Sequence, residues 1–220
     1  MALTLHQHPF ASYCWKALIA LYELDIAFEP RLVGDAADRA ELAELWPMGG
    51  IPVLVDDEAG IVLPESTAII EYLDRGHGRL IPADALRPRL WDRIFDAHVM
   101  TPMQKIVADS LRREGAKDPF GVDEARATLD TAYGLVNARL GHVEWAGGDT
   151  FTVADCAGAP SLFYARVVHR WAEHGLPHLT RYYDALITRP SVARVVDEAR
   201  PYRELFPLPW PGYMDEATVG

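Results

Sequence analysis

Residues 50–73, GIPVLVDDEAGIVLPESTAIIEYL, decide how this chain folds. Two short β-type runs, residues 50–55 and 61–63, lie on either side of a turn through residues 56–60. This pattern predicts two adjacent antiparallel strands. Residues 64–73 follow with a proline at their start and isoleucines and a leucine at helical spacing, which predicts a helix. The stretch is therefore a ββα unit.

The residues before this unit predict a βαβα arrangement. Residues 3–5 form a short β-type run, and residues 15, 18, 19 and 22 place apolar side chains on one helical face. Residues 27–33 read as a second strand, and residues 36–46 as a helix that ends before a proline. The order βαβαββα over the first 75 residues predicts an α/β, thioredoxin-like N-terminal domain.

The residues after this unit lack strand alternation. A stretch punctuated by glycine and proline after residue 76 suits a linker. Periodic segments of helical length follow at residues 86–113, 122–140, 153–169, 179–188 and 192–199. We predict a thioredoxin-like domain over residues 1–76, a linker over 77–85, an all-helical C-terminal domain over 86–207, and an extended C-terminal tail over 208–220.

The charge balance disfavours some partners. The 220 residues include 21 Lys and Arg against 32 Asp and Glu, a formal net charge of -11. Such a surface repels nucleic acid and anionic membranes, so neither is expected as a partner. No apolar run reaches the roughly 18 residues that a membrane helix needs, and the first residues do not read as a secretion signal. A cytoplasmic protein with small-molecule partners is expected.

Three motifs, in their order and spacing, resemble the soluble glutathione transferase superfamily. They are HPFASYCWK at residues 8–16, WPMGGIPVL at residues 46–54 and PESTAIIEYL at residues 64–73. A fourth, FTVADC at residues 151–156, resembles the family's helix-capping box and concerns folding. The similarity spans nearly the whole chain, and the active-site region resembles that of serine-type, zeta- or theta-like bacterial members.

The resemblance implies that glutathione is the co-substrate and that its thiol must be stabilised as a thiolate. The start of the first helix favours an anion there, and a hydroxyl adds a hydrogen bond. Ser12 is the candidate catalytic donor, although a serine there also reads as a simple helix cap. The reactive hydroxyl of serine-type members most often aligns with Ala11, which leaves three alternatives: Ser12, backbone amides alone, or Cys14.

Cys14 falls in the first turn of that predicted helix, where the pKa of a thiol tends to fall. It is therefore a candidate redox residue, able to form a mixed disulfide with glutathione. The alternative is a buried cysteine packed against the sheet. Cys14 and Cys156 form no CxxC pair, and neither a metal site nor a disulfide is expected.

The resemblance also implies four glutathione-binding residues. Ile51 and Pro52 resemble the cis-proline turn of thioredoxin folds, which presents the backbone of Ile51 to the cysteinyl part of glutathione. Ser66 is expected to hold the γ-glutamyl carboxylate at a helix N-terminus, and Glu65 to pair with its ammonium group. Many members use Lys or Gln, instead of glycine at residue 50, for the glycyl carboxylate.

A second subsite for the electrophile is expected between the domains. Its candidate lining residues are Phe10, His98, Met103 and Tyr164. Each of these types is found in the core more often than against a substrate.

The leading hypothesis is a glutathione transferase that attacks a small hydrophobic electrophile, in a detoxification role. Two alternatives stay open: a glutathione-dependent thiol-disulfide reductase that uses Cys14, and a non-catalytic protein that uses the same fold for interaction. Family members form symmetric dimers, so the resemblance implies a homodimer.

Overall fold

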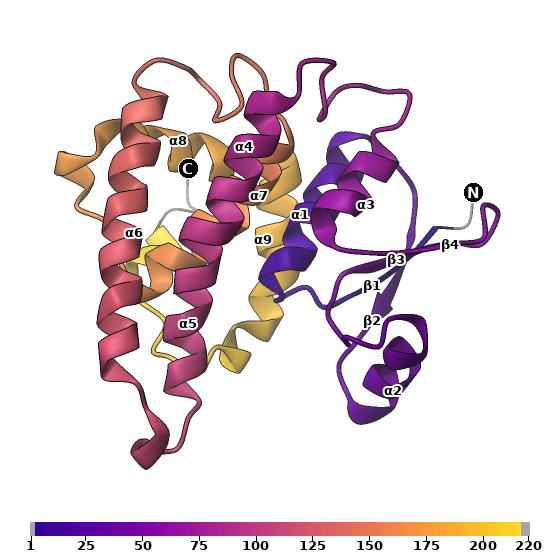
Figure 1. Ribbon diagram of the computed structural model, residues 1–220, viewed down its shortest axis with the longest axis horizontal. Coiled ribbons are helices and arrows are strands. Elements are labelled where there is room, and N and C mark those ends of the chain that lie inside the picture. Colours follow the sequence, from indigo (N-terminus) through magenta and orange to yellow (C-terminus); the bar gives the residue numbers. More distant parts are fainter. Residues whose placement is uncertain (1–2, 217–220) are drawn as a thin grey trace.

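The computed structural model describes residues 3–216 (Figure 1). Its first part is a βαβαββα domain with a four-stranded sheet in the order β2-β1-β3-β4. The thioredoxin-like α/β domain is therefore confirmed. The elements are β1 (Leu3–Gln7), α1 (Ser12–Glu23), β2 (Glu29–Leu32), α2 (Ala36–Leu45), β3 (Val53–Asp56), β4 (Ile61–Pro64) and α3 (Ser66–Leu73).

The sheet is mixed because its connections differ in length. β1 pairs in parallel with β2, and the crossover between them is α1, as parallel strands require a long connection. β3 and β4 pair antiparallel across a short turn, as residues 50–63 predict. Successive side chains of a strand face opposite sides, so Leu54 joins the main core while Val53 packs beside Leu42 of α2.

The rest of the described chain is helical and packs against α1 on the side away from α2 (Figure 1). One apolar cluster runs through both domains, with Trp15 of α1 in contact with Phe163 and Tyr164. The helices are α4 (Leu86–Ile94), α5 (Thr101–Ser110), α6 (Pro119–Leu140), α7 (Val153–Val168), α8 (Pro177–Thr188), α9 (Pro190–Ala199) and α10 (Tyr213–Glu216).

The predicted helix over residues 86–113 is interrupted by a π-helical turn, Phe95–Met100. Pro102 supplies the physical reason: it has no N–H to donate, and its ring crowds the carbonyl four residues earlier. The helix widens here, and the Asp96 carbonyl accepts from both the N–H and the hydroxyl of Thr101. The sequence contains this signal, but helical periodicity alone did not separate α4 from α5.

The prediction of an extended tail over residues 208–220 is wrong in part. Residues 213–216 form α10, in which Met214 is buried and the Tyr213 hydroxyl donates to the carbonyl of Arg166. Before it, Arg200–Leu205 form a 3-10 helix. Residues 217–220 of the predicted tail lie outside the described residues. Apolar burial of Met214 overrides the local preference of a proline-rich segment for extended structure.

The capping motif at the start of α7 organises the centre of the helical domain. Asp155 reaches back to the N–H of Thr152, 2.8 Å away, and also accepts from its hydroxyl. The same carboxylate accepts from the N–H of Ala146 and the hydroxyl of Tyr182, at 2.9 and 2.6 Å. Burial raises the pKa of Asp155 to about 6, against the lowering effect of these donors.

We predict that the carboxylate of Asp155 contributes more to the free energy of unfolding than the hydroxyl of Thr152 does. Thr152→Ala should lower the free energy of unfolding by about 1 kcal/mol. Asp155→Ala should lower it by about 3 kcal/mol or more, because it leaves several buried donors without an acceptor. Urea unfolding measures both changes, with exposed Thr128→Ala as the control. Equal losses for the two α7 variants would contradict this account.

Candidate active site

Two cavities adjoin at the N-terminus of α1. One, of about 610 Å³, is mostly apolar; the other, of about 450 Å³, has both polar and apolar walls and carries all the charged side chains of the two. Tyr13 and Ile51 contribute to the walls of both. The start of α1 therefore lies where a polar ligand and an apolar ligand can meet.

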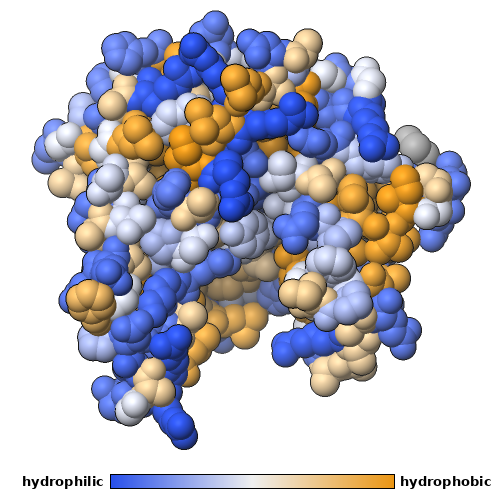
Figure 2. Space-filling view, in the orientation of Figure 1, coloured by the Kyte–Doolittle hydropathy of each residue, from blue (hydrophilic) through white to orange (hydrophobic). Residues whose placement is uncertain are grey.

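The apolar cavity lies between the domains. Figure 2 shows the molecule hollowed between the lower ends of α5 and α6 and the lobe that carries α2. Among the described residues that line the cavity, none is charged. They are Phe10, Ala11, Ser12, Tyr13, Ile51, Met103, Gln104, Val107, Ala108, Leu111, Tyr164, Leu205, Phe206 and Pro207. Such a wall favours a neutral, hydrophobic guest.

The loop between β1 and α1 is fixed from both domains. The indole N–H of Trp15 donates to the carbonyl of Pro9 at 2.7 Å, and the hydroxyl of Tyr164 donates to the carbonyl of Phe10 at 2.9 Å. Tyr164 comes from α7, so the helical domain holds this loop in place. Because its hydroxyl is already engaged, Tyr164 presents mainly its ring to the cavity.

Ser12 is the first residue of α1, and Ala11 occupies the cap position with extended backbone. The alternative interpretation of Ser12 as the cap of this helix therefore does not hold, because Ala11 takes that position. The Ser12 side chain is half-buried, lines the apolar cavity, and makes no hydrogen bond with any described residue. The Ser12 hydroxyl, which has no hydrogen-bond partner among the described residues, thus lies at the positive N-terminal end of α1.

Cys14 lies two residues further along the same turn but is fully buried. Burial raises the pKa of its thiol to about 12, the opposite of the lowering that a redox cysteine in a first helical turn requires. Cys14 lines neither of the two cavities. The structure therefore agrees with a buried, packed cysteine and argues against the redox role.

The polar cavity brings together the four predicted glutathione-binding residues, Ile51, Pro52, Glu65 and Ser66. The Ile51–Pro52 peptide bond is cis, as the resemblance implies. Glu65 has a φ of 70°, a conformation that non-glycine residues adopt rarely and that occurs most often at functional positions. Ser66 begins α3, so its backbone N–H lies at a helix N-terminus.

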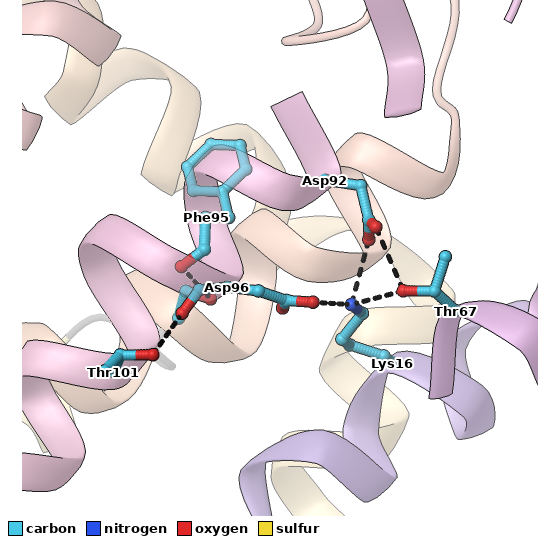
Figure 3. A network of polar contacts seen from close by, with 7 residues as sticks. Lys16, Thr67, Asp92, Phe95, Asp96 and Thr101 are labelled. Carbon is cyan, nitrogen blue, oxygen red and sulfur yellow. Dashed lines mark hydrogen bonds and ion pairs between the residues drawn. The ribbon is translucent and has the colours of Figure 1, made fainter. Parts of the chain in front are cut away.

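A buried charge network forms the floor of this region (Figure 3). The ammonium group of Lys16 lies 2.9 Å from Asp92, 2.7 Å from Asp96 and 3.0 Å from the hydroxyl of Thr67. That hydroxyl donates in turn to Asp92. The network links α1 and α3 to the helical domain, and no pattern in the sequence pointed to it as a unit.

A third recess, of about 430 Å³, also adjoins the loop between β1 and α1. It is lined in part by His8, Gly49, Ile51 and Arg39. The exposed guanidinium of Arg39 contacts the carbonyl of Gly34 at 3.2 Å and has no carboxylate partner among the described residues. A cation therefore lines the same recess as Gly49, the chain neighbour of Gly50, which itself offers no side chain.

Of the four residues predicted to line the electrophile site, three line the apolar cavity and one does not. Phe10, Met103 and Tyr164 lie in the wall of the apolar cavity, whereas His98 is exposed and does not line it. His98 lies within the π-helical turn, Phe95–Met100, on a face that is open to solvent. Sequence reasoning also missed Gln104 and Val107 of α5, Leu111 directly after that helix, and the segment 205–207.

Within residues 3–216, no group of three or more His, Cys, Asp or Glu side chains could hold a metal ion. In the same part of the chain, no helix is both long and apolar enough to cross a membrane.

The fold and the cavities define the class: a thioredoxin-like domain followed by a helical domain, with a polar and an apolar site side by side at their boundary. Residues 5–80 match the model of the glutathione S-transferase N-terminal domain, and residues 119–185 that of the C-terminal domain. The chain is 30% identical over 191 residues to glutathione S-transferase GstB of Escherichia coli K12, covering 82% of this chain and 91% of that protein. The chain belongs to the glutathione S-transferase family.

Other relatives agree with this assignment. Glutathione S-transferase F13 of Arabidopsis thaliana is 26% identical over 212 residues, with 89% of this chain and 95% of that protein covered. A glutathione S-transferase from Methylobacillus flagellatus KT, solved with glutathione bound, superposes with a TM-score of 0.79 at 26% identity. The match covers 88% of this chain and 98% of that one.

The burial of both cysteines gives a direct prediction. Cys14 and Cys156 are fully buried, and burial raises the pKa of each thiol. We expect the native protein to show almost no fast-reacting thiol toward Ellman's reagent at pH 8, because the reagent needs an accessible thiolate. Both thiols should react after unfolding in urea. A native thiol that reacts as fast as free cysteine would contradict the structure.

Proposed function

We propose that this protein is a glutathione transferase that binds glutathione in the polar cavity and directs its thiolate into the apolar cavity. The observation that carries the proposal is the meeting of the two cavities at the N-terminus of α1, where Tyr13 and Ile51 line both. A thiol bound beside Ile51 would face the apolar space. Bringing the two reactants together in this way lowers the entropic part of the barrier.

The polar cavity supports a specific orientation of glutathione. The backbone of Ile51, next to the cis peptide bond, would pair with the cysteinyl portion. Ser66, at the start of α3, would hold the γ-glutamyl carboxylate, and Glu65 would face the ammonium group. The glycyl end then extends toward the recess lined by Arg39 and Gly49. Arg39 would supply the positive charge that Gly50 cannot.

Activation of the thiol is assigned to Ser12 and the positive end of α1. A hydrogen bond to the thiolate stabilises the charged form and lowers the pKa of the thiol. Ser12 supports this role because its hydroxyl is unengaged and faces the apolar cavity, while Ala11 has no hydroxyl to offer.

The electrophile would be small, hydrophobic and neutral. Charged substrates need charged partners when water is excluded, and none of the described residues in the apolar wall carries a charge. This favours conjugation of apolar electrophiles over reactions of dianionic substrates. A detoxification role in the cytoplasm follows as a proposal from the same chemistry.

The two alternative functions receive less support. The reductase hypothesis requires a reachable Cys14 thiolate, and the thiol is buried with a raised pKa. A protein that used this fold only for interaction would need neither the polar cavity nor a Ser12 hydroxyl without a hydrogen-bond partner beside the apolar cavity. Family resemblance also supports a symmetric homodimer, and exposed apolar residues such as Leu86 and Leu90 of α4 offer a surface for it.

The role of Ser12 can be tested on the thiol itself. Thiolate absorbance against pH should give a depressed pKa for glutathione bound to the wild-type protein. We expect Ser12→Ala to raise this pKa by about one unit or more and to lower kcat/KM roughly tenfold to a hundredfold. Cys14→Ala is the matched control and should leave the pKa unchanged. A rise only in the Cys14 variant would favour the reductase.

Arg39 can be tested with a truncated ligand. Arg39→Gln should weaken glutathione binding about tenfold, as expected for the loss of one charged hydrogen bond. Its effect should vanish with γ-glutamylcysteine, which lacks the glycyl carboxylate. Isothermal titration measures both dissociation constants, with Arg126→Gln, on the distant helix α6, as the control. Equal weakening of the two ligands would rule out a contact with the glycyl end.

A further inference from the structure

One polar side chain in the wall of the apolar cavity has no role so far. Among the described residues that line this cavity, four have a side chain with an oxygen or nitrogen atom. They are Ser12, Tyr13, Gln104 and Tyr164. Ser12 is assigned to the thiol, and the Tyr164 hydroxyl already donates to the carbonyl of Phe10 at 2.9 Å. Tyr13 and Gln104 remain for the electrophile.

The hydroxyl of Tyr13 is engaged by the helical domain. It contacts the side chain of Thr101, the first residue of α5. The Thr101 hydroxyl donates to the Asp96 carbonyl at 2.9 Å, so it can only accept from Tyr13. Tyr13 therefore has no hydrogen left for the electrophile, and its contact places the first turn of α5 beside the start of α1, where the thiol is proposed to lie.

Gln104 lies one turn further along α5 than Thr101. Residues three apart share a helix face, and a rise of 1.5 Å per residue separates them by about 4.5 Å along the axis. The Gln104 side chain lines the apolar cavity and is exposed there. Its carboxamide makes no hydrogen bond with any residue in the described part of the chain. A free amide donor is thus one helical turn away from the thiol site.

The rest of this wall is apolar. Gln104 is followed on the same side by Val107, Ala108 and Leu111, and none of the described residues in the wall is charged. A substrate that fills the cavity displaces water from the amide, and a hydrogen bond in such a surrounding is stronger than one in water. The wall therefore favours a neutral, mostly apolar molecule that carries an oxygen acceptor.

The absence of charge among these residues also distinguishes two kinds of thiol reaction. A substitution expels an anion, and a wall without charged groups offers that anion no partner. An addition to a carbon–carbon double bond conjugated with a carbonyl group moves the charge onto the carbonyl oxygen, which stays part of the product. A single preorganised neutral donor can stabilise an oxygen of this kind. Gln104 is such a donor.

We propose that Gln104 selects α,β-unsaturated carbonyl compounds by donating from Nε2 to their carbonyl oxygen. The glutathione thiolate forms a bond with the β-carbon while the electron pair of the double bond moves toward the oxygen, which gives an enolate. The α-carbon then takes a proton from water and the carbonyl re-forms. This proton replaces the one that the thiol lost on ionisation, so the sum is addition of the thiol across the double bond. The inference rests on the proposed transferase function and names its substrate class.

The test compares two electrophiles with one carbon skeleton. trans-2-Hexenal has the carbonyl group, whereas trans-1-chloro-2-hexene lacks it and reacts by substitution. Gln104→Met keeps an unbranched side chain but removes the donor. We expect kcat/KM for the enal to fall about tenfold to a hundredfold, mainly through kcat, because the hydrogen bond strengthens as the oxygen gains charge. The value for the chloride should stay close to that of the wild-type protein. Loss of the enal absorbance and release of chloride measure the two rates.

Two controls separate this role from a general effect on the site. Thr131→Val removes an exposed hydroxyl on α6, outside the cavity, and should match the wild-type protein with both electrophiles. The dissociation constant of glutathione, measured by isothermal titration, should be the same for Gln104→Met as for the wild-type protein. An unchanged rate with the enal, or equal losses with the enal and the chloride, would overturn the proposal.

The pair of electrophiles also separates this inference from the proposed function. A wild-type protein that conjugates the chloride but not the enal would overturn the role of Gln104 and leave the transferase function standing. A wild-type protein that binds glutathione but conjugates neither electrophile would count against both. Loss of enal conjugation alone in Gln104→Met would support both.

Discussion

The position of the two domains depends on a buried cation, Lys16, at their boundary. Its ammonium group is enclosed by Asp92, Asp96 and the hydroxyl of Thr67, which come from α3 and from the helical domain. If one of the two acids were removed, the ammonium group of Lys16 would stay buried without a full set of partners, which is costly. Stability therefore favours an arrangement that keeps all three partners at hydrogen-bond distance. The surrounding apolar cluster then forms around a fixed arrangement of α1, α3 and α4, and the cavities take their shape from it.

The start of α1 gains its chemical character from this arrangement. On one side the two domains enclose charged and polar groups, and on the other they enclose an apolar space. The loop before the helix is tied to α7 through Tyr164, so the helix N-terminus keeps its place between the two. A nucleophile held there would be close to a hydrophobic partner, which is the proximity that the proposed thiol transfer requires.

Two departures from the family pattern are compensated by nearby residues in the proposed mechanism. Ala11 stands where a hydroxyl is usual, and Ser12 offers one on the same helical turn, facing the apolar cavity. Gly50 stands where a longer polar side chain is usual, and Arg39 lines the adjoining recess. In both cases the proposed donor is a residue other than the one that the family pattern uses.

The sequence by itself determined the elements whose signals are local. Apolar periodicity, proline positions and the turn within residues 50–73 predicted the βαβαββα order and the helical second half, because side-chain alternation and backbone restrictions act over a few residues. The motifs also led to Ile51, Pro52, Glu65 and Ser66, which the fold gathers in one cavity.

Tertiary structure alone decided the burial of Cys14, the outward direction of His98 and the meeting of Lys16 with its two acids. Each depends on which surfaces of helices that are distant in the sequence face one another. Such contacts produce no periodic pattern in the sequence. The pKa of a thiol or a carboxyl follows from those contacts and not from neighbours in sequence. The position of a residue in a motif could therefore be predicted, but its burial, and with it its chemistry, could not.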